Sequence, residues 1–294
     1  MVVDSKRGFI LLFKESAVAL SVLFVWDMLI VVGFELYHQS WMEQPALPIA
    51  LIGSVLVLFM NFRNSSAYNR WWEARSYWGL ITNNCRSLAR QINSLLGPEC
   101  PDLTRAVAAY AHTLFCSLRG KDALKNDNVK RVMPESIQQY IKGLHNQPNG
   151  VLYQIALEVT KEANKKNLDG ALQGQIDRIL SDIANAQGAL ERIRNTPLSI
   201  QFSILPRFLA EIFCVILPLS MVQSLGWLTP LGSSLVGFLF IALDKIGSDL
   251  KDPFSDSPHA LPMLTMTRNI EIDLLEQIND PTKPPIRSMN GIQW

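Results

Sequence analysis

The chain has 294 residues, of which 48% are hydrophobic and only 18% are charged, against about 25% charged residues in an average soluble domain. Its formal net charge of +1 argues against a nucleic-acid partner, because domains that bind nucleic acids carry a strong positive excess. No GxSxG, HExxH or P-loop motif occurs, and the four histidines lie far apart with no acidic or cysteine partner at ligand spacing. We therefore expect no enzyme, no catalytic residues, no metal site and no cofactor.

The first predicted element is an apolar stretch from Ala17 to Leu36 without Lys or Arg. About 20 helical residues cross the ~30 Å hydrocarbon core of a bilayer, so this stretch predicts a spanning helix. It is longer than the apolar region of a signal peptide and offers no small-residue cleavage site. Asp27 lies near its middle, where a carboxylate is costly and often functional. A hydrogen-bonded carboxyl group at a helix–helix contact is an equally weighted interpretation.

The second apolar stretch runs from Pro45 to Phe62 and passes without a helix breaker into a polar helical pattern that ends near Leu96. Ser54, Leu58 and Phe62 are spaced by four residues and therefore share one helix face. In a ring of identical chains they would form successive, mostly apolar rings at a constriction, and such constrictions can gate by dewetting. Ordinary core packing explains the same spacing, and on spacing alone we favour it.

Residues 63–207 have the patterns of a helical body, with no alternating β pattern of useful length and no internal repeat. Caps, glycines, prolines and apolar spacing of three to four residues set the expected helix boundaries. We expect a helix capped by Asp102 and ending at Gly120, one from Pro134 to about Leu144, one beginning at Pro148, and one that contains Leu172, Ile176, Ile183 and Ile193 and stops at Pro197.

Two further apolar stretches follow, from Phe208 to Trp227 and from Leu231 to Leu243. The second of these is short and would cross a bilayer only if the polar residues at its ends lie at the interfaces. Beyond Lys245 the chain becomes rich in proline, with one predicted helix from about Met266 to Ile278 and an extended tail.

The basic residues are confined to three parts of the chain. All 27 Lys and Arg fall within residues 1–16, 63–207 and 245–294, and the connectors at 37–44 and 227–231 carry none. Because cytoplasmic loops carry an excess of Lys and Arg, this pattern predicts four transmembrane helices with both termini and residues 63–207 in the cytoplasm. The expected location is the inner (plasma) membrane. The scattered cysteines, without a CxxC motif, predict buried, reduced thiols: Cys85, Cys100, Cys116 and Cys214.

Three ordered motifs resemble the bestrophin family, in particular its bacterial members. The first follows the second span, the second ends the last helix of the body, and the third follows the fourth span. Together the resemblance covers nearly the whole chain. The matching residues are Phe62-Arg63-Asn64, Tyr68, Arg70-Trp71 and Glu73-Ala74-Arg75; Glu191-Arg192-Ile193 with Asn195-Thr196-Pro197; and Asp252-Pro253-Phe254 with Leu261-Pro262.

The resemblance implies an all-α integral membrane protein with one channel domain over residues 1–294. Its parts would be transmembrane hairpins at about 17–62 and 208–245, a cytoplasmic body at about 63–207 and a C-terminal segment at 246–294. It also implies a homopentamer around one axial pore with a neck formed by Ser54, Leu58 and Phe62. Ser54 departs from the apolar residue usual in the family. A second, lower constriction is implied near the start of the last body helix, and its register stays open among Leu168, Ala171, Leu172 and Ile176.

The function implied by the resemblance is passive conduction of monovalent ions, as an anion or chloride channel. Alternatives are a cation-selective bacterial channel of the same fold, a secondary ion transporter using Asp27 and Glu35, and a membrane scaffold. The partners expected are further copies of the chain, membrane lipids and the permeant ions. The segment from Asp252 to Ala260 retains only two carboxylates and is interrupted by a proline, where animal members have an acidic cluster, so we expect no calcium site. Arg70 and Glu73, three residues apart, are predicted to form a structural ion pair.

Overall fold

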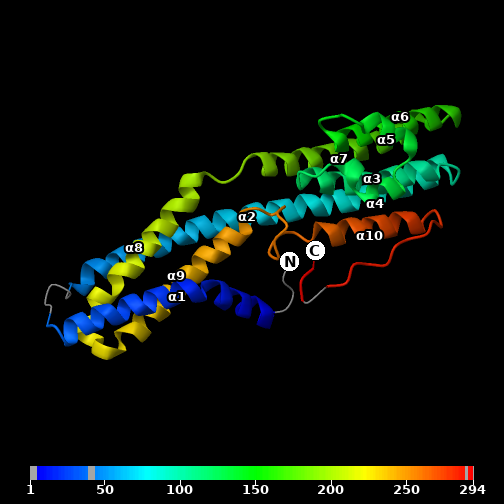
Figure 1. Ribbon diagram of the computed structural model, residues 1–294. Helices are drawn as coiled ribbons and strands as arrows, with labels where there is room; N and C mark the ends of the chain where they lie inside the picture. The colour runs from blue at the N-terminus through cyan, green and yellow to red at the C-terminus, as the bar shows by residue number, and fades with distance from the viewer. Residues whose placement is uncertain (1–4, 39–43, 289–290, 294) are drawn as a thin grey trace. The chain divides into compact units, whose positions relative to one another are not determined.

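The computed structural model describes residues 5–38, 44–288 and 291–293, which form helices joined by loops and a non-helical C-terminal segment after α10 (Met263–Glu276), without a β-strand (Figure 1). The all-α class predicted from the sequence is therefore confirmed. Two compact units can be separated. We call residues 2–71 with 197–252 the hairpin unit, and residues 72–196 with 253–294 the helical body. The connector predicted at 37–44 lies mostly outside the described residues.

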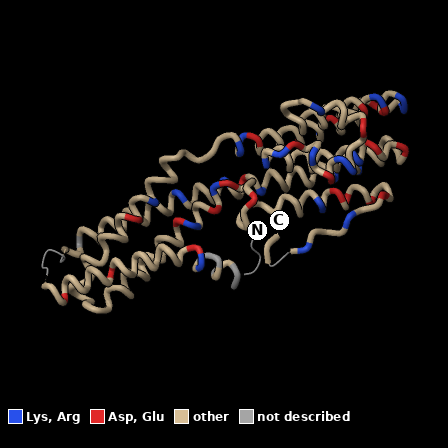
Figure 2. Tube along the Cα trace, viewed as in Figure 1, with Lys and Arg blue, Asp and Glu red and all other residues tan. Residues whose placement is uncertain are grey.

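The hairpin unit contains the apolar helices. They are α1 (Ser5–Glu35), the first part of α2 (Ala46–Gln91), α8 (Ile200–Leu225) and α9 (Thr229–Leu250). Figure 2 shows how few charged residues these helices carry compared with those of the helical body. Three helical runs are long and apolar enough to cross a membrane, at Phe13–Glu35, Pro48–Leu96 and Ile200–Leu250.

The third of these runs holds two packed helices. A 3₁₀ turn at Gly226–Leu228 joins α8 to α9, and the two helices pack against each other. Gly226 has φ = +50°, a conformation that glycine adopts without the steric cost a Cβ would bring. This arrangement fits the two predicted apolar stretches, while the count of four spans stays a prediction.

The core of the hairpin unit lies where α2 meets α8. Leu56 and Met60 of α2 are buried in a cluster with Phe213 and Leu217 of α8. Gly53 permits this close approach, because a Cβ at that position would stand 2.9 Å from the ring of Phe213. Small residues serve this purpose in membrane helices, where helix association depends on close van der Waals packing.

The helical body is built around α3 (Pro101–Leu118), which packs against α4, α6, α7 and α10 and is buried along nearly its whole length. Four of its residues are fully buried alanines, whose short side chains let neighbouring helices approach from several sides: Ala106, Ala108, Ala109 and Ala111. The surrounding elements are the rest of α2 with a π-helical turn at Ile92–Leu96, α4 (Asp127–Val132), α5 (Glu135–Ile141), α6 (Gln147–Lys165), α7 (Gly170–Asn195) and α10 (Met263–Glu276).

The ends of α3 differ partly from the prediction. The cap residue is Cys100 rather than Asp102, because Pro101 has a preset φ and no N–H and suits the first helical position. Asp102 instead pairs with Arg105 across one turn, at 2.9 Å. At the other end the prediction of Gly120 after the helix is confirmed: it has φ = +66°, and its N–H donates to the carbonyl of Ser117. This is the αL ending that glycine favours.

Two other boundaries are shifted, and the short helix α4 was not predicted. Helix α5 ends at Ile141 rather than near Leu144, since Gly143 adopts φ = +82° and ends the helical geometry. Helix α10 begins at Met263, three residues earlier than predicted, directly after Pro262. Pro262 is not helical itself, and a helix can begin directly after a proline.

Candidate functional site

Apart from a narrow strip that packs on α8, the apolar part of α2 is left uncovered by the rest of the chain. Leu58 is 57% exposed and Phe62 is 63% exposed, while Ser54 is exposed and its Oγ donates to the carbonyl of Ala50 at 2.9 Å. At about 100° per residue, Leu58 lies roughly 200° around the helix from the buried Leu56. Core packing within one chain, which spacing alone favoured, is therefore wrong for these three residues. We call Ser54, Leu58 and Phe62 the α2 stripe.

The end of the α2 stripe is followed at once by two residues that tie α2 to α9. Arg63 is 4% exposed and forms an ion pair with Asp244, and Asn64 Nδ2 donates to the carbonyl of Leu243 at 2.9 Å. Gly247 makes room for this contact, because a Cβ there would overlap Asn64 Oδ1. The first two polar residues of the motif after the second span thus hold α2 in a fixed rotation within the hairpin unit.

The next acidic residue of that motif is used differently from the prediction. Glu73 Oε1 accepts a hydrogen bond from Arg192 Nη2 of α7 at 2.7 Å, so its ion pair is with α7 rather than with Arg70. Both side chains of this pair are partly exposed. The other residues of this motif that the sequence singled out are exposed or half-buried side chains of α2: Tyr68, Arg70, Trp71 and Arg75.

The motif at the end of α7 belongs to a polar network inside the helical body. Glu191 accepts hydrogen bonds from Gln187 Nε2 at 2.8 Å and from Asn146 Nδ2 at 3.0 Å. The hydroxyl of buried Tyr110 donates to Gln187 Oε1 at 2.9 Å. The network joins α7 to α3 and to the start of α6, so Glu191 has a positioning role. Two further motif residues at the end of α7 are exposed: Asn195 and Pro197.

In the motif after α9, the acidic residue is exposed and the two residues that follow it are buried. Asp252 is exposed, whereas Pro253 and Phe254 are buried, and the carbonyl of Pro253 accepts from the N–H of Leu261 at 2.9 Å. Asp256 in this loop pairs with Lys121 at 2.9 Å and with Arg119. Hydrogen bonding to Lys121 holds the pKa of the Asp256 carboxyl below its ordinary value, with the Arg119 charge acting in the same direction.

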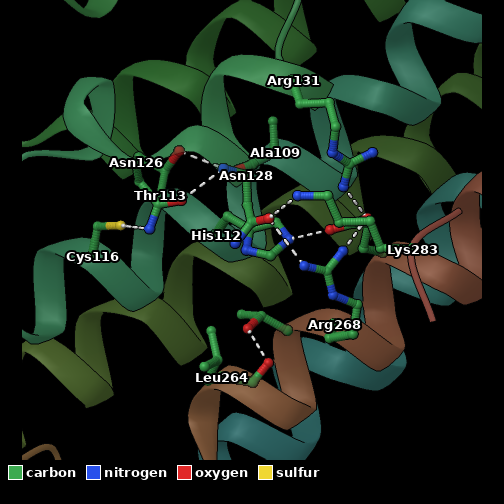
Figure 3. A network of polar contacts seen from close by, with 12 residues as sticks. Ala109, His112, Thr113, Cys116, Asn126, Asn128, Arg131, Leu264, Arg268 and Lys283 are labelled. Atoms are coloured by element: carbon green, nitrogen blue, oxygen red, sulfur yellow. Dashed lines mark hydrogen bonds and ion pairs between the residues drawn. The ribbon is translucent and has the colours of Figure 1, made fainter. Parts of the chain in front are cut away.

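A buried polar cluster in the helical body was missed by the sequence analysis (Figure 3). His112 Nε2 of α3 lies 2.6 Å from Glu271 Oε2 of α10, and both side chains are fully buried. Arg268 Nη1 donates to Glu271 Oε1 at 2.7 Å, and Arg131 pairs with the same carboxylate. Asn128 accepts from Arg268 and Lys283, at 2.9 and 3.1 Å. The cluster thereby ties α10 and the segment after it to α3 and α4.

Glu271 is held charged in this cluster. Burial by itself raises the pKa of its carboxyl, but hydrogen bonds from His112 and Arg131 outweigh that effect and lower the pKa below its ordinary value. His112 and Glu271 are 159 positions apart, so no ligand-like spacing could have indicated the pair. The one sequence signal was the i, i+3 spacing of Arg268 and Glu271.

The residues considered for a lower constriction differ in exposure. Ile176 is fully buried in the core of the helical body. Ala171 is exposed, and Leu168 and Leu172 are half-buried. A side chain that its own chain buries has no surface to present to an axial pore, so Ile176 is the least suited of the four.

Asp27 is fully buried where α1 packs on α9, and its Oδ2 accepts a hydrogen bond from Ser234 Oγ at 3.4 Å. This geometry favours the helix-contact interpretation. The cysteines are free thiols, and the prediction that they are also buried holds for three of them, whereas Cys100 is half-buried. Within the described part of the chain no group of three or more His, Cys, Asp or Glu could hold a metal ion.

The chain is similar to known proteins over most of its length. Residues 11–276 match the family model described as bacterial/fungal bestrophin protein. A voltage-dependent anion channel-forming protein of Nostoc sp. is 33% identical over 240 residues, covering 78% of each chain. One of Escherichia coli K12 is 27% identical over 274 residues, covering 90% of this chain and 86% of that protein.

The fold is also similar to that of a solved structure. A crystal structure of a bacterial bestrophin homologue from Klebsiella pneumoniae superposes with a TM-score of 0.83 at 26% identity, covering 89% of this chain and 98% of the other. The chain has the fold of this bestrophin homologue, and it contains apolar helical runs long enough to span a bilayer. It is therefore a membrane protein. With a family model that matches residues 11–276, the chain belongs to the bacterial and fungal bestrophin family.

Proposed function

We propose that this chain is the subunit of an anion channel of the inner membrane, with its pore on the axis of a homopentamer. The relatives that match most of the chain bear the name of voltage-dependent anion channel-forming proteins. The hairpin unit supplies helices long enough to span the bilayer. Four short spans are too few to enclose a hydrated path within one chain, and cyclic symmetry provides that path between identical chains.

The observation that carries the proposal is the exposure of the α2 stripe. Leu58 and Phe62 are large apolar side chains, each more than half exposed, on the side of α2 opposite to its packed strip. In a symmetric ring every subunit would contribute these two side chains to the same aperture. Apolar rings offer an ion no replacement for its water, so the neck would set most of the barrier. Ser54 would make the outermost ring less apolar and easier to wet.

The anchor at Arg63 and Asn64 supports the same proposal. A neck lined by one helix face requires that face to point steadily at the axis, and the two contacts to α9 fix the rotation of α2 directly after Phe62. The second constriction is proposed at the start of α7, where Ala171 is exposed and Leu168 and Leu172 are half-buried. Both termini and the helical body would then be cytoplasmic, and monovalent ions would be conducted.

The test is single-channel recording from purified protein in planar bilayers. The double variant Leu58→Ala and Phe62→Ala should raise unitary current, because the truncated rings widen and partly wet the neck. The matched control is Val57→Ala with Phe59→Ala, which removes exposed apolar side chains on the same helix turns but outside the α2 stripe; its current should equal that of the wild type.

Two further measurements make the test decisive. Native mass spectrometry should give about five times the 33.0 kDa chain mass for all variants. Reversal potentials in asymmetric NaCl should follow chloride, and potentials that follow sodium would mean a cation channel of the same fold. Unchanged current in the stripe variant, from an intact oligomer, would show that the pore lies elsewhere.

A further inference from the structure

A cavity of about 540 Å³ opens in the hairpin unit between α1, α8 and α9. Its volume falls in the ~300–1,000 Å³ range of small-molecule sites. Its walls change character along the helices. One end is lined by charged side chains and the other by apolar ones, among them Ala19 and Val22 of α1, Val215 of α8 and Ile241 of α9.

The charged end coincides on all three helices with the expected edge of the bilayer. Glu15 precedes the first apolar stretch, Arg207 precedes the third, and Lys245 follows the fourth. Ala19 and Val215 lie one to two helical turns deeper, which is about 6–12 Å at 1.5 Å per residue. The cavity therefore runs from the polar boundary into the apolar part of the hairpin unit.

The charges at its mouth are of both signs and are paired. Arg207 Nε lies 3.0 Å from Glu211 Oε1 in a pair whose two side chains are more than 60% exposed. Lys245 Nζ lies 2.9 Å from Glu15 Oε2. Asp244 also lines the mouth and pairs with Arg63. Lys245 Nζ also lies 3.2 Å from Asp249 Oδ1. The pairs of Arg207 with Glu211 and of Lys245 with Glu15 are partly or largely exposed, and such pairs are weak enough to exchange partners.

A second cavity of about 390 Å³ adjoins the first at this level. The two share Arg207, Glu211, Asp244 and Ser248, and the second is also lined by the cations Arg63 and Lys251. The mouth thus offers cations and carboxylates side by side over an extended area. A headgroup that bears only negative charge would meet Glu15 and Glu211 as well as the cations, so the charge pattern does not suit it.

We propose that this cavity binds one zwitterionic phospholipid with a primary ammonium group. Its phosphate accepts hydrogen bonds from Arg207 and Lys245, and its ammonium donates to Glu15 and Glu211. One acyl chain lies along Ala19, Val22 and Val215. A primary ammonium has three N–H donors for the carboxylates, whereas a quaternary choline group has none, so ethanolamine headgroups are preferred over choline headgroups. This inference requires only that the chain lies in a membrane; it does not depend on the proposed conduction.

The experiment is native mass spectrometry of delipidated full-length protein titrated with single phospholipids of matched acyl chains. Phosphatidylethanolamine should bind more tightly than phosphatidylcholine or phosphatidylglycerol. Ala19→Phe, which fills the cavity, should abolish its binding. The matched control Val18→Phe adds the same side chain at a position that is 76% exposed and does not line the cavity, and should bind as the wild type does.

Arg207→Gln tests the headgroup contact. Loss of one charge-assisted hydrogen bond should weaken phosphatidylethanolamine binding about tenfold and leave the mass of the oligomer unchanged. Equal binding of phosphatidylcholine, or tighter binding of phosphatidylglycerol, would overturn the headgroup assignment. Unaltered lipid binding by Ala19→Phe would overturn the cavity itself, and loss of the oligomer in that variant would show that a neighbouring chain occupies it. Channel current is measured separately, so a failure here leaves the proposed function untouched.

Discussion

At the scale of single residues, the polar side chains of the family motifs serve mainly to hold helices together. Arg63, Glu73 and Glu191 each reach a partner on another helix. Arg63 is the most buried of the three, and its charge is balanced by Asp244. A buried charge that loses its partner is costly, because neither water nor a counterion replaces what was removed.

Arg63→Gln is therefore expected to lower the free energy of unfolding by about 3–5 kcal/mol, the range for a broken buried pair. Thermal unfolding in detergent measures this as a lower midpoint. Lys161→Gln is the matched control, since it removes a cation whose pair with Glu158 is exposed and worth about 0–1 kcal/mol. Equal midpoints for the two variants would mean that the Arg63–Asp244 pair contributes little.

Glu271 predicts how the stability of the helical body depends on pH. Its native pKa is below the ordinary value of 4.5, so the native state binds this proton less readily than the unfolded state does. The stabilisation is fully present above pH 4.5 and is lost as the pH falls through the lower native pKa. Glu271→Gln removes the charge and hence this part of the pH dependence.

Unfolding midpoints measured from neutral pH down to about pH 3 check this expectation. The wild type should lose stability across the acid window, and Glu271→Gln should start lower at neutral pH and decline less. Glu158→Gln, at an exposed carboxylate, should follow the wild-type curve. Parallel curves for the wild type and Glu271→Gln would contradict the linkage.

At the scale of elements, α2 packs against other helices along one side and leaves the α2 stripe exposed. Its first half packs a narrow strip on α8 and leaves the α2 stripe uncovered, and contacts to α9 follow directly after it. These contacts are possible because two glycines let a side chain of a neighbouring helix lie close to the helix backbone. At Gly53 the ring of Phe213 occupies the space of a Cβ, and at Gly247 the side chain of Asn64 does so.

Gly247→Ala is expected to destabilise the hairpin unit, because the new Cβ overlaps Asn64 Oδ1 and displaces the side chain that donates to Leu243. The expected loss is about 1–3 kcal/mol, as for overpacking at a tight site. Gly188→Ala in α7 is the control: nothing lies within 4 Å of its Cβ position, and alanine there should stabilise the helix by about 0.5–1 kcal/mol. Thermal midpoints that shift in the same direction for both variants would refute the close-contact explanation.

At the scale of the whole molecule, the confinement of Lys and Arg to three segments predicts the orientation in the membrane. A cysteine placed at Gln39, which lies outside the described residues, should react with an impermeant maleimide applied to intact cells. One placed at Lys142 in the helical body should react only after the membrane is permeabilised. Labelling of the Lys142 position in intact cells would contradict the cytoplasmic location. The native thiols give little background, since three of the four are buried.

The sequence alone determined the helical class, the apolar stretches and several helix boundaries. These properties follow from local causes: the length of apolar runs against bilayer thickness, the 3.6-residue period, and the caps and prolines at helix ends. The family could be recognised for the same reason, since its motifs are contiguous. Boundaries were wrong where a neighbouring residue overrode the expected cap, as Pro101 did at the start of α3.

Only the tertiary structure decided which side chains meet. The period of α2 placed Ser54, Leu58 and Phe62 on one face but left open whether that face was core, and the packing of Leu56 and Met60 on α8 left it exposed. Likewise, no spacing indicated that Glu271 would meet His112, or that Glu73 would pair with Arg192 rather than Arg70. The residue pattern of a helix shows which side chains share a face of that helix. Ion pairs and cavities depend in addition on how several helices pack together, and these helices are far apart in the sequence.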